Sequence, residues 1–168
     1  ADANTVVAKD TLLNTVTTNG EGKAVFSADL PIGFDYYVKE IQAPGNYLKS
    51  SEDTYSFRFE PANGSEAKVS FSYTFTDQRA TATIQLQKVD LETGANVPQG
   101  DASLEHAVYG LYARKDIVHP DQKSGVLYQA GEQVATLTTD REGKAKIENL
   151  YMGEYFVKEI TPPAGYLA

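Results

Sequence analysis

Four ionisable residues stand where the sequence pattern predicts apolar strand faces. Alternate residues of a strand share one face, and Lys88 continues the face formed by Ala82, Ile84 and Leu86. The same alternation places Glu40, Asp77 and Glu159 after the apolar positions of residues 36–38, 69–75 and 155–157. One interpretation is that each strand ends there and the charge reaches water, with Lys88 laying its stem along apolar surface. The other is that the charges point inward.

A buried lysine held against buried carboxyl groups is capable of a specific reaction. A charge taken out of water has to be paired, neutralised or consumed. Burial favours neutral forms, in which lysine is a nucleophile and a protonated glutamic acid can polarise a carbonyl and move protons. Held in contact in a dry core, lysine and aspartic acid could condense to an amide with loss of water, and asparagine would lose ammonia instead. If the charges point inward, these residue types could therefore form an amide cross-link.

The elements that would position these residues are written twice in the chain. Residues 15–26 (TVTTNGEGKAVF) correspond to residues 136–147 (TLTTDREGKAKI). Residues 36–48 (YYVKEIQAPGNYL) correspond in the same way to residues 155–167 (YFVKEITPPAGYL). Two matching pairs in the same order indicate an internal repeat. The alternative is two different small domains.

Each copy is typical of β-hairpins separated by tight turns. The turns are expected at residues 19–22, 31–33 and 43–45 and at residues 140–143, 151–153 and 162–165. Glycine supplies the positive φ of such turns, and asparagine or aspartate tolerates it. Proline cannot extend a paired strand, so the aromatic strands should end at Pro44 and Pro162. The segment around Glu105–Tyr112 alternates as a strand rather than as a helix.

The two copies are not cut at the same point. The second copy has lead-in strands expected around Thr81–Val89 and His106–Ala113. The first copy continues instead through strands expected around Thr54–Glu60 and Ala67–Thr76. We therefore expect an all-β chain of two tandem Ig-like β-sandwich domains, each incomplete at one end and joined by a linker at Gln78–Thr81. Their bounds would be residues 1–79, lacking the N-terminal strands, and residues 80–168, lacking the C-terminal strands.

Composition and charge narrow the possible partners. The formal net charge is -8, so the phosphates of nucleic acid and anionic lipid would repel the chain. No apolar run approaches the roughly 20 residues of a membrane span. We therefore expect neither nucleic-acid binding nor membrane insertion. The chain has no cysteine, which fits either a reducing compartment or an extracellular protein with another kind of covalent staple.

The sequence offers little for an enzyme or a metal site. Its only histidines are His106 and His119, and no serine stands in a nucleophile-elbow pattern. No glycine-rich phosphate loop opens a helix. Residues 90–92 and 140–142 carry oxygen ligands without the spacing of a calcium loop, so we interpret them as turn residues. We expect no enzymatic activity, no cofactor and no metal.

Three ordered motifs carry a family resemblance. LQKVDLETG (86–94), HAVYGLYA (106–113) and TTDREGKAKIENLYMGEYFVKEITPPAGY (138–166) follow one another in the second copy. They resemble the Cna B-type, or SpaA-type, domains of Gram-positive adhesins and pilins, whose pattern is roughly KxDxxTG, GAxFxLY and TxxxGxxxFxxLxxGxYxxxExxAPxGY. The chain departs from this pattern at His106, usually Gly, at Tyr109, usually Phe, and at Pro162, usually Ala.

The resemblance implies a prealbumin-like β-sandwich with an isopeptide bond. In that family the bond joins a lysine of the first strand to an asparagine or aspartate of the last, and a buried glutamate promotes it. Lys88 resembles the reactive lysine, and Glu159 and Glu40 resemble the promoting glutamates of the second and first domains. Asp77 resembles the acceptor of the first domain. The partners of Lys88 and Asp77 would lie outside this chain, so we expect no complete bond within either domain.

The resemblance also implies a function. It predicts a structural stalk segment of an adhesin or pilin-like protein, anchored extracellularly to the cell wall of a Gram-positive bacterium, with neighbouring repeats as partners. The alternative is a ligand-binding module for a host matrix protein or glycan, with the loop Arg114–Gly125 as its candidate surface. The open strand edges of incomplete sandwiches further predict an edge-paired or swapped dimer.

Overall fold

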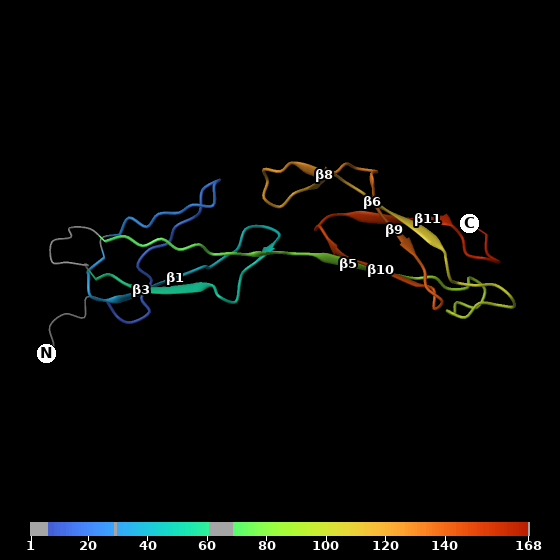
Figure 1. The fold of residues 1–168 in the computed structure, drawn as a ribbon, viewed down its shortest axis with the longest axis horizontal. Helices are drawn as coiled ribbons and strands as arrows, with labels where there is room; N and C mark the ends of the chain where they lie inside the picture. Colours follow the sequence, from blue (N-terminus) through green and yellow to red (C-terminus); the bar gives the residue numbers. More distant parts are fainter. Residues whose placement is uncertain (1–6, 29, 61–68, 168) are drawn as a thin grey trace. The chain divides into compact units, whose positions relative to one another are not determined.

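The computed structural model describes residues 7–28, 30–60 and 69–167, which form strands and loops but no helix (Figure 1). The predicted all-β class is confirmed. Two compact units can be distinguished. The first comprises the described residues of Ala1–Lys39 and Thr54–Tyr73, and the second those of Glu40–Asp53 and Thr74–Ala168. In the described ranges, no helix has the length and apolar character needed to cross a membrane.

The first unit is built on one pair of aromatic strands. β1 (Asp35–Lys39) pairs antiparallel with β3 (Thr54–Arg58), which places Tyr36 opposite Phe57. The rings on this face form a continuous cluster of Tyr36, Tyr55, Phe57, Phe59, Phe71 and Tyr73. Stacked and edge-on aromatic contacts of this kind add stabilisation beyond the area that they bury.

The second unit is a two-layer structure of antiparallel strands (Figure 1). One layer pairs β5 (Ala82–Gln87) with β10 (Lys144–Leu150). The other has the order β11 (Tyr155–Thr161), β6 (Val108–Ala113) and β9 (Gln133–Thr138). Two short pairs complete the unit, namely β2 (Tyr47–Leu48) with β4 (Gln78–Arg79), and β7 (Ile117–Val118) with β8 (Val126–Tyr128).

The core of this unit contains side chains from both layers. Leu111 and Leu137 of the three-stranded layer pack with Ala145 and Leu150 of β10, and all four are buried. The inward positions of β5 lie against this core, namely Ala82, Ile84 and Leu86. Because the alternation of β5 leads directly to Lys88, its side chain starts at the edge of the core rather than on the solvent face.

The turn that recurs in the two copies has the same hydrogen bonds in both. The side-chain oxygen of Asn19 accepts bonds from the backbone N–H groups of Glu21 (2.9 Å) and Lys23 (3.0 Å). Asp140 accepts the equivalent pair at 3.0 and 2.8 Å. Gly22 and Gly143 both adopt a positive φ, 75° and 74°. Identical turn geometry at corresponding positions supports the internal repeat read from the sequence.

The predicted hairpins are wrong in two places. The turn at residues 140–143 joins β9 to β10, which belong to different layers, so it crosses the sandwich instead of closing a hairpin. In the first copy, residues 15–26 form no strand, and neither do residues 69–76 of the predicted strand Ala67–Thr76. Residues 67 and 68 lie outside the described part. A strand requires a ladder partner, and among the described residues no strand ladder includes these segments.

Other local expectations are also corrected. Gln78 and Arg79 of the predicted linker form strand β4, and the predicted loop Arg114–Gly125 contains strand β7. Val157, expected on a core face, is 40% exposed because β11 is the edge strand of its layer. The expected end of the second aromatic strand agrees with the structure, because β11 stops at Thr161, directly before Pro162. The first ends earlier than expected, since β1 stops at Lys39 and does not reach Pro44.

Candidate functional site

Lys88 is positioned by a close approach of the Asp140–Gly143 turn. Its backbone N–H donates a 2.7 Å hydrogen bond to the carbonyl of Gly143. A Cβ at position 143 would lie only 2.7 Å from the carbonyl oxygen of Lys88. Glycine is therefore required here both for its positive φ and for the space. The repeated turn thus has a second role, which is to hold the backbone of Lys88 next to the start of β10.

The ammonium group of Lys88 is paired with Glu159. Lys88 Nζ donates a 2.8 Å hydrogen bond to Glu159 Oε1, and the two side chains are 16% and 23% exposed. The two residues come from different layers, at the end of β5 and within β11. A charge-assisted bond in such a half-buried place is stronger than a solvent-exposed ion pair. The pair joins an amine to a group that can exchange protons with it.

Tyr109 is a further contact of Glu159. The two residues stand directly opposite each other in the β6–β11 ladder. Burial raises the pKa of Tyr109 to about 12, and the hydrogen bond from its hydroxyl to Glu159 adds to this effect. Glu159 therefore accepts from both Lys88 and Tyr109. In the sequence, Tyr109 stands out only as a departure from a family pattern, and nothing there indicates that it belongs to the site.

Asp90 and Tyr166 close the other side of Lys88. Asp90 is 5% exposed, and its Oδ1 accepts bonds from the N–H groups of Glu92 and Thr93 and from the amide of Gln99. Its Oδ2 accepts a 2.9 Å bond from the hydroxyl of Tyr166. The backbone bond from Thr93, followed by the Tyr166 bond, lowers the pKa of Asp90 to about 2. The Tyr166 ring lies 5.9 Å from Lys88 Nζ, within cation–π range.

Glu40 and Asp77 form a second pair. Glu40 directly follows β1, and its backbone N–H bonds to the carbonyl of Asp53 at 2.8 Å. Burial raises the pKa of Glu40, and its hydrogen bond with Asp77 and the Asp77 charge raise it further, whereas Lys49 lowers it. Glu40 Oε2 and Asp77 Oδ1 are buried without a hydrogen-bond partner among the described residues. The raised pKa of Glu40 favours its protonated form, which can donate to Asp77.

The structure thus arranges the four predicted residues as two pairs, one of lysine with glutamate and one of glutamate with aspartate. All four are partly buried, none fully exposed and none fully buried. The pairs differ in chemistry, because Lys88–Glu159 contains an amine and Glu40–Asp77 contains two acids with spare acceptor oxygens. Sequence alternation located each residue at the edge of a core. It did not indicate Tyr109 or Tyr166. Both fit the strand and turn patterns as aromatic residues, and those patterns say nothing about their hydroxyl groups.

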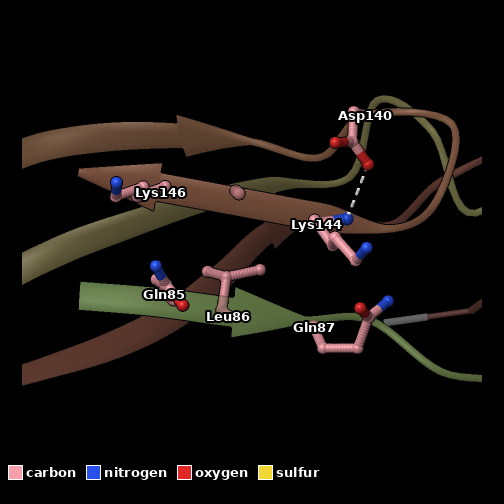
Figure 2. A pocket seen from close by; sticks show the side chains of 7 residues that line it. Gln85, Leu86, Gln87, Asp140, Lys144 and Lys146 are labelled. Atoms are coloured by element: carbon pink, nitrogen blue, oxygen red, sulfur yellow. Dashed lines mark hydrogen bonds between the residues drawn. The ribbon is translucent and has the colours of Figure 1, made fainter.

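A shallow hollow over the β5–β10 ladder has no comparable chemistry. Figure 2 shows the two strands side by side, with Gln85, Leu86 and Gln87 facing the β10 residues Lys144 and Lys146. Asp140 at its end accepts the backbone N–H of Lys144. These amides and ammonium groups offer neither a nucleophile next to a base nor a metal-ligand set. Among the described residues, no group of His, Cys, Asp and Glu is arranged to hold a metal ion.

Polar side chains of the loop Arg114–Gly125 form hydrogen bonds and ion pairs with other residues of the second unit. Asp121 accepts from the N–H groups of Lys123 and Ser124, both at 2.9 Å. Lys115 forms an ion pair with Glu154. His119 packs its ring against that of Tyr151, with centroids 5.6 Å apart. These contacts order the loop.

Comparison with known families identifies the chain. The model of the SpaA prealbumin-like fold domain matches twice, over residues 2–79 and over residues 82–168. The chain therefore belongs to the SpaA prealbumin-like family and contains two tandem domains of it. Such domains are found in pilins and adhesins of Gram-positive bacteria, where the fold is structural or adhesive. No curated protein matches the chain significantly.

Proposed function

We propose that the chain is a stalk segment of a Gram-positive cell-wall-anchored adhesin or pilin-like protein, stabilised in the intact protein by autocatalytic isopeptide bonds. The segment would consist of the domains 1–79 and 80–168, with neighbouring repeats of the same protein as its partners. The observation that supports this most directly is the 2.8 Å contact between Lys88 Nζ and Glu159 Oε1 in a half-buried position. The chain is a tandem repeat without cysteine, and it holds an amine next to a proton acceptor. A cross-link formed by this amine would reinforce a rod under tension in place of disulfides.

Each residue would have a definite role in bond formation. The Lys88 ammonium gives a proton to Glu159, and the free Nζ attacks the side-chain carbonyl carbon of an asparagine or aspartic acid on a facing strand. The new C–N bond forms as the C–NH₂ or C–OH bond breaks. Glu159 returns the proton to the leaving group, which departs as ammonia or water, and then takes the remaining extra proton from the newly bonded Nζ to leave a neutral amide. In the first domain, Asp77 would be the acceptor and Glu40 the proton donor, and their unpartnered buried oxygens would accept the N–H groups of an incoming lysine.

The test is a peptide map of the intact surface protein. Tryptic digestion should yield Lys88 joined to a segment that carries asparagine or aspartate, at a mass lower by about 17 or 18 Da than the sum of the two peptides. Lys88→Arg and Glu159→Gln should both abolish the joined peptide. Recovery of Lys88 entirely in an unlinked peptide from the folded protein would refute the proposal. If only one of the two variants lost the cross-link, the residue changed in the other would not have the role proposed for it.

A further inference from the structure

β11 has an open edge, and the first copy of the repeat contains the corresponding strand with a neighbour. Residues 36–48 and 155–167 correspond in the sequence, so β1 is the counterpart of β11. β1 pairs with β3. β11 pairs with β6, and among the described residues no strand pairs with its other edge. The two copies therefore allow the same strand to be compared with two different neighbours.

The edge of β1 that binds β3 can be assigned from one hydrogen bond. Directly opposed residues of an antiparallel pair alternate between those that exchange backbone hydrogen bonds and those that do not. The N–H of Glu40 donates to the carbonyl of Asp53 at 2.8 Å, which continues the β1–β3 register. The backbone groups of residues 36, 38 and 40 therefore face β3.

The same reasoning shows which edge of β11 is open. The carbonyl of Glu154 accepts a 2.8 Å bond from the N–H of Arg114, which continues the β11–β6 register. The backbone groups of residues 154, 156 and 158 therefore face β6, and those of residues 155, 157 and 159 face the open edge. These three are the counterparts of residues 36, 38 and 40, so the open edge of β11 is the edge with which β1 binds β3.

One valine differs between the two copies in the way that a missing neighbour predicts. Val38 stands opposite Tyr55 of β3 and is half-buried. Its counterpart Val157 is 40% exposed, although Tyr155 and Glu159 on the same face keep the partial burial of their own counterparts. A strand laid along the open edge would cover Val157.

The charges next to this edge also correspond. Arg58 of β3 forms a 3.3 Å ion pair with Asp35, which stands directly opposite on β1. The counterpart of Asp35 is Glu154, an exposed acid that also pairs with Lys115. Exposed ion pairs add little affinity but help to fix the register. An arginine of an incoming strand would therefore meet an acid at the same position.

We propose that the open edge of β11 is an acceptor site for a β3-type strand, supplied by a neighbouring repeat of the same protein. A β3-type strand has the pattern of residues 54–60 (TYSFRFE), in which aromatic and polar residues alternate. Lying antiparallel to β11, it would place its tyrosine opposite Val157 and its arginine opposite Glu154. Repeats are the source because one of them, residues 1–79, contains such a strand. The inference rests on the proposed function for this source and names the surface through which repeats would join.

The test adds the end-blocked peptide TYSFRFE to the full chain and follows amide hydrogen exchange by NMR spectroscopy. Main-chain hydrogen bonds provide the affinity in this mode of recognition. The N–H groups of Tyr155, Val157 and Glu159 should therefore exchange about tenfold more slowly at saturating peptide. The N–H of Val38, which already faces β3, should not change.

Backbone methylation of the peptide provides matched controls with identical side chains. The N–H groups of Tyr55 and Phe57 face β1 in the structure, so N-methylation at these two positions should abolish the protection. N-methylation at Ser56 and Arg58, whose N–H groups point the other way, should leave it. Val157→Pro in the chain should also abolish binding, because proline lacks the N–H that faces the open edge.

Three outcomes would overturn the proposal. One is no protection of β11 at any peptide concentration, and another is equal protection by the two methylated peptides. The third is protection that appears without peptide and grows with chain concentration, which would assign the edge to a second copy of the chain. Peptide binding without a cross-link in the peptide map would refute the proposed function alone, whereas a cross-link without peptide binding would refute this inference alone.

Discussion

The hydroxyl of Tyr166 donates a 2.9 Å hydrogen bond to Oδ2 of Asp90, joining two residues that lie 76 positions apart in the sequence. Asp90 caps the turn that follows Lys88, and Tyr166 follows the proline pair that ends β11. The contact therefore clamps the segments after β5 and β11, the strands that supply the lysine and the glutamate of the candidate site.

The Asp90 clamp predicts loss of stability in acid. The folded-state pKa of Asp90 is about 2, below the ordinary 3.8, chiefly because of the Thr93 backbone bond and then the Tyr166 bond. A lowered carboxyl pKa contributes stability that is fully present above about pH 4 and is lost as the pH falls toward 2. Thermal unfolding followed by circular dichroism should show this loss, and Asp90→Asn should flatten it. A steeper acid transition in Asp90→Asn would contradict the assignment.

Removing one hydroxyl tests the clamp separately. Tyr166→Phe should lower the melting temperature by a few degrees at neutral pH, because Asp90 then loses one of its partners. Tyr37→Phe, an exposed ring of the first unit, is the control and should change nothing. Equal melting temperatures for the wild type and Tyr166→Phe would mean that water replaces the hydroxyl without loss.

Thr139 predicts a larger and more local effect. Its side chain is buried, and its Oγ1 donates to the carbonyl of Leu104 at 2.6 Å and accepts the N–H of Ala107 at 2.9 Å. Thr139→Val preserves the shape but leaves two buried backbone groups unpaired, which should cost about 1–3 kcal/mol of unfolding free energy. Thr138→Val, one residue earlier on the exposed face, should change it by less than about 0.5 kcal/mol. Comparable urea midpoints for the two variants would count against this role.

Arg79 predicts a pattern of proteolysis. Its guanidinium lies 4.0 Å from the centroid of the Tyr151 ring and donates to the carbonyls of Asn149 and Leu150, each at 3.3 Å. These contacts tie β4 to the β10–β11 connection and should shield the bond after Arg79 from trypsin. Arg79→Lys retains the cleavage site but loses the planar stack and the forked donors. Cleavage at residue 79 should become several-fold faster, with cleavage after the exposed Lys123 as the internal standard. Identical rates at residue 79 would show that the clamp does not protect the strand.

Much of the second unit follows from the sequence. Alternation gave β5 and β6 nearly to the residue, and it placed Lys88 and Glu159 at the edge of one core, where they meet. The structure also accounts for the glycine that is usual at the position of His106, because the φ of 68° there is one that glycine adopts more easily. Periodicity carries this information because it reports which side of a strand is covered.

The features that the sequence did not indicate depend on contacts between distant segments. A turn such as residues 140–143 is encoded locally, but whether it closes a hairpin or crosses between layers depends on which strand β10 finds as a partner. The hydroxyl groups of Tyr109 and Tyr166 add little to any periodic pattern, so their bonds to Glu159 and Asp90 were not predicted. In the first unit the alternation of residues 15–26 and 69–76 was real, yet strands form only where a ladder partner is present.

The Glu40–Asp77 pair predicts a stability that falls as the pH rises. Burial first, and then the hydrogen bond and charge of Asp77, raise the pKa of Glu40 above its ordinary value. The folded state therefore binds a proton more tightly than the unfolded state, so the favourable contribution is complete in mild acid and is lost as the pH passes through the raised pKa. Above that pKa the charged Glu40 destabilises the folded state, because Glu40 Oε2 and Asp77 Oδ1 are buried without a hydrogen-bond partner among the described residues.

Glu40→Gln should remove this loss of stability at neutral pH. The amide is neutral at every pH and can donate to Asp77, so the variant should be more stable than the wild type at neutral pH and should lose the decline between mild acid and neutrality. The measurement is the urea midpoint across that pH range, with the exposed Glu52→Gln as the charge-matched control. Because both variants remove one negative charge, only a local effect of the Asp77 pair separates them. A Glu40→Gln protein that is less stable than the wild type at neutral pH, or that keeps the same slope with pH, would show that the raised pKa of Glu40 does not cause this pH dependence.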